Sequence, residues 1–434
     1  MSGHDQILEL RSPPGRNLAG TVRVPGDKAL AHRILILGAM ARGETRVRGL
    51  PAGDDVDATC RCLAALGVTL ERCEDAARVV GLGRGRFLTP AAPLDCGASA
   101  STIRMLMGAV AGRGLAAGFT GDESLRRRPM DRVALALAGT GATVTWDAQE
   151  GRPPCTLRSA ATPRAQTYTL PVPSGQVKTA LILAALGADG RTVITGRIDS
   201  RDHTERLVPR LGGRLVVGGG RIIVEGGPLE AIAYSLPGDP SSAAILAAAA
   251  TLLPGSRIHM PGVLSNPTRT GFFDALRWMG GDVQITGERE AEGEPVADFE
   301  IRHRSLQGIE IPASAIPFMI DELPLLALLA TQARGITVIQ GVAEARLKET
   351  DRVAAAVEEL GKMGAALRAE GDALVVEGPT PLHGAELDAR GDHRTAMCLA
   401  LAARIARGSS RLAGAQTVNK SWPGFFGILE ELSG

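Results

Sequence analysis

The stretch "ARGETRVRG" at residues 41–49 combines a glycine turn with a short polar strand, and similar stretches recur along the chain. The copies are "GLAAGFTG" (114–121), "GRTVITG" (190–196), "GSRIHMPG" (255–262), "GITVIQG" (335–341) and "GSSRLAG" (408–414). Their closing glycines, at positions 49, 121, 196, 262, 341 and 414, are 66 to 79 residues apart. Six copies at so regular a spacing indicate an internal repeat.

An apolar stretch rich in alanine and leucine precedes each copy, as in "ALAHRILILGAMA" (29–41) and "VKTALILAALGA" (177–188). Few charges interrupt these stretches, which is typical of helices buried on nearly every side. Each copy is followed by an amphipathic helix and a glycine stop before a strand, as in "ALAGTGATVTW" (136–146). The repeat is therefore predicted to run strand–helix–strand–helix–strand, with a further strand in most copies.

These repeats predict an α/β (α+β) protein of two similar domains, each with three βαβαββ-type repeats, buried helices and outer sheets. The last repeat stops at "ILEELSG" (428–434), without a following strand. The stretches "QILEL" (6–10) and "GTVRVPG" (20–26) could supply the missing strands. We therefore expect one domain to comprise residues 1–25 and 238–434, and an inserted domain to comprise residues 26–237.

The composition is that of a globular protein: 434 residues, 44% apolar and 22% charged, with a net charge of +1. This balance gives no reason to expect nucleic acid or an anionic membrane as a partner. Six sparse cysteines suit neither a disulfide framework nor a zinc site, so we expect reduced thiols in the cytoplasm. The first residues carry no secretory signal, and no apolar run reaches membrane-spanning length.

Basic residues occur where many of the predicted helices begin. Small polar caps are ordinary at such places and explain about half of the polar residues there. A cation at the positive end of a helix dipole is unfavourable unless an anion joins it, so the pattern predicts a highly anionic small ligand in a shared cleft. The basic residues in question are Lys28, Arg104, Arg128, Lys348, Arg352, Arg394 and Lys420.

Three other patterns favour less specific interpretations. "GAQTVNKS" (414–421) is one residue from a phosphate-binding loop, but Asn419 replaces a glycine that the loop needs. "RDHTE" (201–205) has a single histidine, so a helix cap is a better interpretation than a metal site. His32 lies on an apolar helix and is interpreted as a packing residue.

Ten segments, in this order, resemble the 5-enolpyruvylshikimate-3-phosphate (EPSP) synthases, the 3-phosphoshikimate 1-carboxyvinyltransferases. They are specific together, although each alone would be weak. The segments are "VPGDKALAHR" (24–33), "DCGASASTIR" (95–104), "RRRPM" (126–130), "PSGQVKTALILA" (173–184), "SRDHTER" (200–206), "PGDPSSAA" (237–244), "IDELPLLALLATQA" (320–333), "RLKETDR" (346–352), "DHRTAMC" (392–398) and "VNKSWPGFF" (418–426).

The resemblance implies an inverse α/β barrel of two domains of three repeats, with the active site in the cleft between them. It also implies transfer of the enolpyruvyl group of phosphoenolpyruvate to the 5-hydroxyl of shikimate 3-phosphate, by addition and elimination through a tetrahedral intermediate. Phosphate is released, and neither metal nor cofactor takes part. We expect a cytoplasmic monomer whose partners are these two small molecules.

The site residues that the resemblance implies fall into three groups. Phosphoenolpyruvate is expected to bind Lys28, Arg128, Arg352, Arg394 and Lys420, with Ala100 nearby, and Arg104 is a further expected substrate-binding residue. Shikimate 3-phosphate is expected to bind Arg33, Ser174, Gln176 and Ser200, with Lys348 nearby. Asp321 and Glu349 are the candidate acid–base pair, and Lys28 is the third candidate catalytic residue.

Four positions depart from the family pattern. Ala29 stands where serine is usual, Ala98 where asparagine is usual, Ala100 where glycine is usual, and Gly175 where serine or alanine is common. Ala100 predicts tolerance of glyphosate, because its methyl group would intrude on that inhibitor more than on the shorter phosphoenolpyruvate.

The departures leave two alternatives open. One is a related carboxyvinyl transferase that uses another hydroxylated acceptor, although "RRRPM", "SRDHTER" and "DHRTAM" disfavour the UDP-N-acetylglucosamine enzyme. The other is an inactive anion-binding homologue, which the presence of both Asp321 and Glu349 disfavours.

Overall fold

The computed structural model describes residues 7–11, 17–83 and 85–433, which form two compact units. Unit 1 comprises the described residues of Met1–Pro25, Pro237–Glu290 and Pro295–Gly434. Unit 2 comprises Gly26–Leu236 and the short segment Ala291–Glu294. Each unit contains three copies of one pattern, in which a buried helix is followed by a strand, a second helix and, in all but the last copy, further strands. The predicted fold class is therefore confirmed.

Unit 2 contains twelve strands and seven helices among its described residues. The first repeat has α1 (Lys28–Met40), β3 (Arg42–Arg48), α2 (Asp54–Ala65), β4 (Thr69–Cys73) and β5 (Ala76–Leu82). The second has β6 (Leu94–Asp95), α3 (Ala100–Ala111), β7 (Ala116–Thr120), α4 (Glu123–Arg126), α5 (Asp131–Ala138), β8 (Thr143–Trp146) and β9 (Cys155–Arg158). The third has β10 (Thr167–Leu170), α6 (Gly175–Gly187), β11 (Arg191–Gly196), α7 (His203–Arg210), β12 (Arg214–Gly218) and β13 (Arg221–Glu225), and β14 (Ala233–Ser235) follows it.

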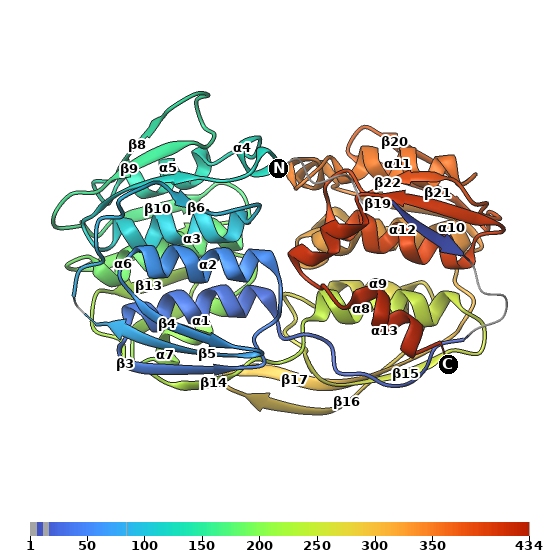
Figure 1. The fold of residues 1–434 in the computed structure, drawn as a ribbon, viewed down its shortest axis with the longest axis horizontal. Coiled ribbons are helices and arrows are strands. Elements are labelled where there is room, and N and C mark those ends of the chain that lie inside the picture. The colour runs from blue at the N-terminus through green and yellow to red at the C-terminus, as the bar shows by residue number, and fades with distance from the viewer. Residues whose placement is uncertain (1–6, 12–16, 84, 434) are drawn as a thin grey trace. The chain divides into compact units, whose positions relative to one another are not determined.

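The three sheets of unit 2 share one strand order. In the third repeat, β10 pairs in parallel with β11, which pairs antiparallel with β13 of the hairpin β12–β13. The first repeat lacks a leading strand of its own, and β14 takes that place in parallel with β3. The end of the inserted chain therefore completes the sheet with which the unit begins. In Figure 1, α1 and α3 lie between the sheet of β3 and β5 and that of β8 and β9.

Unit 1 contains the other three repeats, and two of its strands come from the N-terminal residues that precede unit 2 in the chain. Its N-terminal strands are β1 (Leu8–Arg11) and β2 (Ala19–Thr21). The fourth repeat has α8 (Pro240–Leu252), β15 (Arg257–Leu264), α9 (Gly271–Trp278), β16 (Asp282–Ala291) and β17 (Glu294–Arg302). The fifth has β18 (Glu310–Ile311), η1 (Ala313–Phe318), η2 (Ile320–Glu322), α10 (Leu323–Gln332), β19 (Gly335–Gln340), η3 (Ala343–Leu347), α11 (Arg352–Lys362), β20 (Ala366–Glu370) and β21 (Ala373–Gly378), where η marks a 3₁₀ helix. The sixth has β22 (Glu386–Asp388), α12 (His393–Ile405), β23 (Ser409–Ala413), η4 (Ala415–Lys420) and α13 (Phe425–Glu431).

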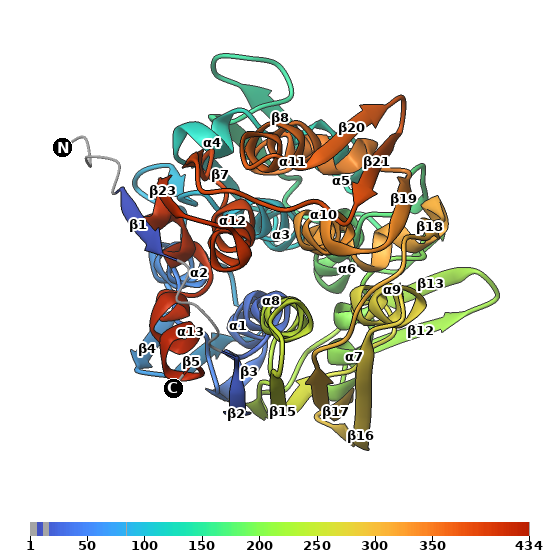
Figure 2. The same cartoon turned by 90° about the vertical axis from the view of Figure 1, so that its right-hand side faces the viewer.

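The two N-terminal strands complete the sheets of the fourth and sixth repeats. β2 pairs in parallel with β15, from Ala19 opposite Arg257 to Thr21 opposite His259. β1 pairs antiparallel with β23, where the other repeats have a hairpin strand from their own sequence. Figure 2 shows α8, α10 and α12 nearly end-on, with the strands of the three sheets around them.

The buried helices pack closely because their residues are small. All residues of α8 from Pro240 to Thr251 are buried, and six of these twelve residues are alanine. Between α3 and α6, an added Cβ at Gly108 would lie 2.3 Å from the Ala180 oxygen. Any side chain at Gly108 would therefore force these two helices apart.

The recurring glycines lie at or near the end of the central strand of each repeat, and five of the six have a left-handed backbone conformation. Their φ values lie between +70° and +83° at Gly49, Gly196, Gly262, Gly341 and Gly414. The copy that ends at Gly121 is the exception: there an added Cβ would lie 2.4 Å from the Gly97 oxygen. Glycine is thus required at five copies by backbone conformation and at the sixth by close approach.

All six cysteines are free, as predicted. Burial raises the pKa of Cys60 to about 11 and that of Cys155 to about 12, which makes both thiols poor nucleophiles. Within the described part of the chain, no helix combines the length and the apolar character that crossing a membrane requires.

Candidate active site

The predicted site residues of the inserted sequence lie where the helices of unit 2 begin. Lys28 is the first residue of α1, Ala100 is the first of α3, and Ser174 caps α6. Arg128 and Ser200 lie three residues before α5 and α7. We call these residues, with Arg33, Arg104 and Gln176, the unit 2 cluster.

Lys28 forms an ion pair with a carboxylate of the neighbouring helix. Its Nζ lies 2.8 Å from Asp55 Oδ2, and both side chains are largely buried. Asp55 is the second residue of α2, at the positive end of that helix dipole, where a carboxylate is favourable. The pair therefore neutralises a cation that would otherwise lie unbalanced at the start of α1.

A hydrogen-bond chain joins the starts of α3, α5 and α6. Arg104 Nη1 donates to Gln176 Oε1 at 2.5 Å, and Arg104 Nη2 donates to the Pro129 oxygen at 2.8 Å. Gln176 Nε2 donates in turn to Ser101 Oγ at 2.8 Å. Residues from three motifs far apart in sequence thus lie side by side.

Arg33 is buried and holds helices together. Its Nε donates to Thr204 Oγ1 at 3.0 Å, and Nη2 donates to Thr179 Oγ1 at 3.0 Å. Nη1 and Nη2 also donate to the oxygens of Ala29 and Gly175, at 2.8 and 3.4 Å. These contacts favour a positioning role, whereas direct contact with substrate stays a prediction.

The hydroxyl groups of Ser174 and Ser200 have different surroundings. Ser174 Oγ accepts from the Val177 amide at 3.4 Å and caps α6. Ser200 Oγ is buried and has no hydrogen-bond partner among the residues that the structure describes. A buried hydroxyl without a partner is unfavourable by about 1–3 kcal/mol, so a bound ligand that supplied one would be favoured.

A buried hydrogen-bond chain fixes the start of α3, where Ala100 lies. His32 Nδ1 and Thr59 Oγ1 are 2.7 Å apart, and Thr59 Oγ1 is 2.7 Å from Thr102 Oγ1. Thr102 Oγ1 donates to Oγ of Ser99, the N-cap of α3. Complete burial lowers the pKa of His32 to about 3, with Asp55 opposing the shift, so this imidazole is neutral at pH 7. His32 is thus buried as a packing residue would be, but its Nε2 has no hydrogen-bond partner among the residues that the structure describes.

The predicted site residues of the C-terminal half surround one buried guanidinium in unit 1. Arg352, the first residue of α11, has 1% of its side chain exposed. Its Nε donates to Asp392 Oδ2 at 2.7 Å, Nη1 to Asp321 Oδ1 at 3.0 Å and Nη2 to Glu349 Oε2 at 2.7 Å. Burial opposes the charge, but the three carboxylates outweigh it and raise the pKa of Arg352 above its ordinary value. Both candidate acid–base residues therefore share one permanent cation.

Two further cations approach Asp321, and a third, Lys420, ends η4. Lys348 Nζ is 3.7 Å from Asp321 Oδ1, and Arg394 Nη2 is 3.7 Å from Asp321 Oδ2. Arg394 Nη1 also lies 3.2 Å from Glu322 Oε1. Lys420 donates to the oxygen of Gly391, which directly precedes the N-cap of α12. These residues, with Arg352, Glu349 and Asp392, form the unit 1 cluster.

The carboxylates of the unit 1 cluster bear on the prediction that cations at helix starts require an anionic ligand. Lys348, Arg352, Arg394 and Lys420 carry four positive charges, and Asp321, Glu322, Glu349 and Asp392 carry four negative ones. An external anion is therefore not required to balance the cations of the unit 1 cluster. An anionic ligand would instead exchange with these carboxylates as the partner of the cations.

The motif "RDHTE" (201–205), at the start of α7, does not form the helix cap that the sequence predicted. The Asp202 side chain makes no capping hydrogen bond and accepts instead from Arg206 Nε at 2.8 Å. His203 Nδ1 lies 2.7 Å from Glu294 Oε1 in a fully buried pair. The ligand atoms of Asp202, His203 and Glu294 lie within 4.8 Å of one another, and Arg206 Nε is 3.6 Å from Glu294 Oε2. The Arg206 guanidinium thus supplies a positive charge beside both carboxylates.

Comparison with known proteins agrees with this arrangement of residues. The family model of EPSP synthase (3-phosphoshikimate 1-carboxyvinyltransferase) matches residues 13–429. The chain belongs to the EPSP synthase family. A 3-phosphoshikimate 1-carboxyvinyltransferase of Roseiflexus castenholzii is 42% identical over 96% of this chain and 98% of its own, and one of Geobacillus kaustophilus is 43% identical with the same coverage.

Solved structures support the fold of this EPSP synthase family member. An EPSP synthase from Acinetobacter baumannii matches 98% of both chains with a TM-score of 0.86 and 34% identity. The enolpyruvyl transferase NikO from Streptomyces tendae has a TM-score of 0.78 at 20% identity, and it bears on the fold alone.

The structure gives a physical reason for one departure from the family pattern. An added Cβ at Gly175 would lie 3.2 Å from Arg201 Cβ, which is closer than ordinary van der Waals contact. A serine or alanine at position 175 would therefore require Arg201 to shift. Ala29 and Ala98 are half-buried, and nothing in their surroundings explains why they lack a polar group.

Some members of the clusters were not predicted as site residues. Asp55 lies in the acidic start of α2, and Glu322 and Asp392 stand beside predicted residues, but their partners are distant in sequence. Lys178, which lies outside both clusters, carried a clearer signal, because it is the one charged residue in the apolar sequence of α6. Charged residues are almost never fully buried unless they are paired, so Lys178 indicated an unseen partner.

Proposed function

We propose that the protein catalyses the reaction of its family, transfer of the enolpyruvyl group of phosphoenolpyruvate to the 5-hydroxyl of shikimate 3-phosphate with release of phosphate. The observation that carries the proposal is the geometry around Arg352. Its guanidinium binds Asp321 and Glu349 together, which are the two carboxylates that the family resemblance implies for acid–base catalysis. Both substrates are anionic, and both clusters present Lys and Arg at helix starts.

Phosphate and carboxylate groups of the substrates would replace protein carboxylates as partners of the cations. Hydrogen bonds between ionised groups are about twice as strong as neutral ones, and arginine can bind such groups in a bidentate way. We assign phosphoenolpyruvate to Lys28, Arg128, Arg352, Arg394 and Lys420, and shikimate 3-phosphate to Arg33, Ser174, Gln176 and Ser200, with Lys348 nearby. Residues of both units are thus proposed to act on one pair of substrates.

The chemistry divides into two steps that need proton transfer at the same atoms. In the addition, the 5-hydroxyl oxygen bonds to C2 of phosphoenolpyruvate and loses its proton, while the C3 methylene gains a proton to become a methyl group. In the elimination, the methyl group loses a proton, the double bond re-forms, and the C2–phosphate bond breaks. Asp321 and Glu349 are proposed to exchange these protons, with Lys28 stabilising charge on the transferred group.

The second candidate function is transfer of the same group to a different hydroxylated acceptor. Ala29 and Ala98 favour it, because each lacks a polar group that the family pattern has near the acceptor, and Gly175 is a further departure there. They do not affect the cations assigned to phosphoenolpyruvate.

One experiment distinguishes these functions: phosphate release from phosphoenolpyruvate, measured with shikimate 3-phosphate and with a panel of other hydroxylated acceptors. Fastest release with shikimate 3-phosphate supports the first function, and faster release with another acceptor supports the second. No release with any acceptor, from a folded protein that binds phosphoenolpyruvate, would support an inactive anion-binding homologue.

We further propose that the enzyme works as a monomer in the cytoplasm. The monomer rests on the family resemblance, and the free, buried cysteines fit a reducing compartment. Sedimentation equilibrium at micromolar concentration tests the first part, and a mass of twice 45.1 kDa would contradict it.

A further inference from the structure

Lys178 uses all of its hydrogen-bonding capacity inside unit 2. Its ammonium group lies 2.7 Å from Glu205 Oε1, and 1% of its side chain is exposed. It also donates to the oxygens of Ile198 and Ser200, at 2.9 and 3.1 Å. A lysine has three N–H donors, and each of them has an acceptor here.

The three acceptors all belong to the segment that leads from β11 into α7. We call Ile198–Glu205 the Ser200 segment, because it carries the proposed acceptor-binding hydroxyl. The next residue of α6, Thr179, holds the far part of the segment: its Oγ1 is 2.7 Å from Thr204 Oγ1. Lys178 therefore fixes the part of the segment around Ile198 and Ser200, and Thr179 fixes the part around Thr204.

Stability alone is a weak explanation for such a pair. Removing an ammonium and a carboxylate from water is expensive, and apolar residues of similar volume are often as stable in their place. Burial raises the pKa of the Glu205 carboxyl, and Lys178 opposes that rise. The directed bonds from Lys178 to two backbone oxygens, by contrast, set the position of the segment in a way that apolar packing cannot.

We propose that Lys178, held by Glu205, is a positioning residue that fixes the Ser200 segment and thereby sets the affinity for the acceptor. This inference rests on the proposed function, in which Ser200 binds shikimate 3-phosphate. Lys178 acts through the backbone of Ile198 and Ser200 and does not itself contact the substrate.

The first test is Lys178→Met, measured by steady-state kinetics for each substrate separately. Misplacing a supporting group typically changes affinity or rate by about 10- to 100-fold, so we expect the KM for shikimate 3-phosphate to rise by about tenfold or more. The KM for phosphoenolpyruvate should change by less than about threefold, because the cations assigned to it keep their partners. Equal changes in both KM values, or no change in either, overturn the proposal.

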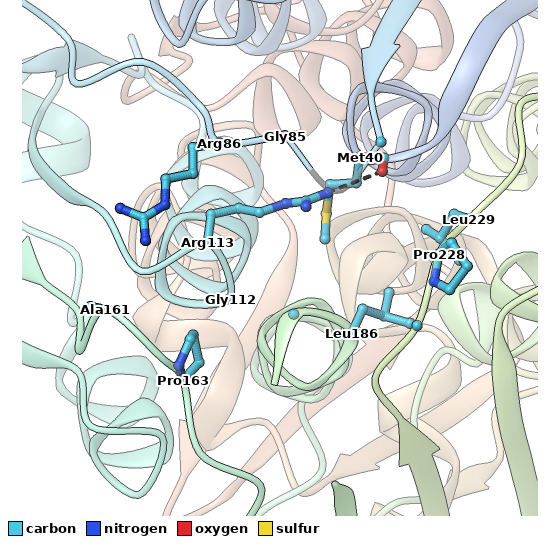
Figure 3. Close-up of a pocket in the computed structure, with 13 residues that line it drawn as sticks. Met40, Gly85, Arg86, Gly112, Arg113, Ala161, Pro163, Leu186, Pro228 and Leu229 are labelled. Carbon is cyan, nitrogen blue, oxygen red and sulfur yellow. Dashed lines mark hydrogen bonds between the residues drawn. The ribbon is translucent and has the colours of Figure 1, made fainter. Parts of the chain in front are cut away.

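Two further variants separate positioning from stability. Lys178→Met with Glu205→Gln leaves no unpaired buried charge, so it should fold even if the single variant does not, and it should retain the rise in KM. Arg113→Met is a matched control, because Arg113 donates to the Met40 oxygen at 3.0 Å where α1 ends, beside a pocket of about 140 Å³ (Figure 3). It should lower the melting temperature and leave both KM values unchanged.

A double-mutant cycle that combines Lys178→Met with Ser200→Ala tests whether Lys178 acts through Ser200. In the Ser200→Ala background, Lys178→Met should raise the KM for shikimate 3-phosphate by no more than about threefold, because coupled sites are not additive. The same factor in both backgrounds overturns the proposal.

Hydrogen exchange of the ligand-free protein provides a readout that does not depend on the substrate. Lys178→Met should speed amide exchange at residues 198–204 and leave the amides of α3 unchanged. If the unaltered protein does not consume shikimate 3-phosphate, the proposed function has failed, and unchanged exchange would separately overturn this inference.

Discussion

Arg352 donates from Nη1 to Asp321 Oδ1 at 3.0 Å, although the two residues are 31 positions apart and belong to different helices. The same guanidinium donates from Nη2 to Glu349, three positions before it. An arginine with a raised pKa stays charged through catalysis, so its electrostatic effect on both carboxylates is constant. Any change in the protonation of Asp321 and Glu349 must then be caused by the bound substrates, which displace hydrogen bonds of these two carboxylates.

Replacement of either acid–base candidate is expected to impair turnover more than binding. Glu349→Gln and Asp321→Asn keep the size of the side chain and remove the proton-transfer group, so turnover should fall by about two to four orders of magnitude. Calorimetry beside steady-state kinetics separates the two effects. Glu358→Gln on α11 is the matched control, because Glu358 is half exposed and pairs with Arg390. A Glu349 or Asp321 variant that loses affinity but keeps its turnover number would contradict the assignment.

Ala29→Ser should tighten shikimate 3-phosphate if that molecule is the true acceptor. One regained hydrogen bond is worth about 0.5–1.5 kcal/mol, which corresponds to a several-fold gain in affinity at most. Titration calorimetry measures the change, and Ala64→Ser on the exposed face of α2 controls for an added hydroxyl. No gain, or a loss, would instead favour a different acceptor.

Tolerance of glyphosate is expected from Ala100, which is buried at the first position of α3. One extra methyl group in a tight site typically costs about 1–3 kcal/mol, so Ala100→Gly should lower the inhibition constant about ten- to a hundredfold. The KM for phosphoenolpyruvate should change little. Inhibition curves for both proteins decide the matter, and equal sensitivity would show that Ala100 does not meet the inhibitor.

The buried His32 predicts a loss of stability in acid. Its pKa is about 3 in the folded protein and about 6.5 in an unfolded chain, so unfolding takes up a proton between those values. The contribution is fully present above pH 6.5 and is lost as the pH falls toward 3, with a slope of at most about 1.4 kcal/mol per pH unit. His32→Asn retains a donor near Thr59 and removes the titration. The free energy of unfolding of unit 2, measured in urea from pH 7 to pH 4, should be less pH-dependent in this variant, and an equal slope would contradict the prediction.

The sequence predicted the features of the fold that depend on local patterns. The six glycine turns and the alanine-rich helices were visible because backbone conformation and burial impose the same residue types on each repeat. The short 3₁₀ helices were not predicted: Asp321 lies in η2, and Lys420, which was predicted at the start of a helix, ends η4. In both cases the α-helix begins later, at Leu323 and Phe425.

The residue types of the site could be predicted from the sequence, but the ion pairs between them could not. Family motifs identified Lys28 and Arg394 as cations near the site. Their partners Asp55 and Glu322 lie 27 and 72 residues away, and only the packing of helices brings them together. A lysine in an apolar helix signals a buried partner, but the pattern around Lys178 could not indicate whether that partner was Glu205 or another carboxylate.

The pairing of β1 with β23 and of β2 with β15 has a consequence for how the chain assembles as it leaves the ribosome. Residues 26–236 are contiguous, so unit 2 can form nearly all of its structure as soon as they have been translated. The strands that complete unit 1 are translated first but pair with segments around residues 260 and 410, and the second of these is among the last to emerge. Translation therefore favours completing unit 2 before unit 1, because domains tend to fold as units once their residues are available. An affinity tag or a tethered domain fused ahead of Leu8 would extend directly from a strand needed for this final step of assembly.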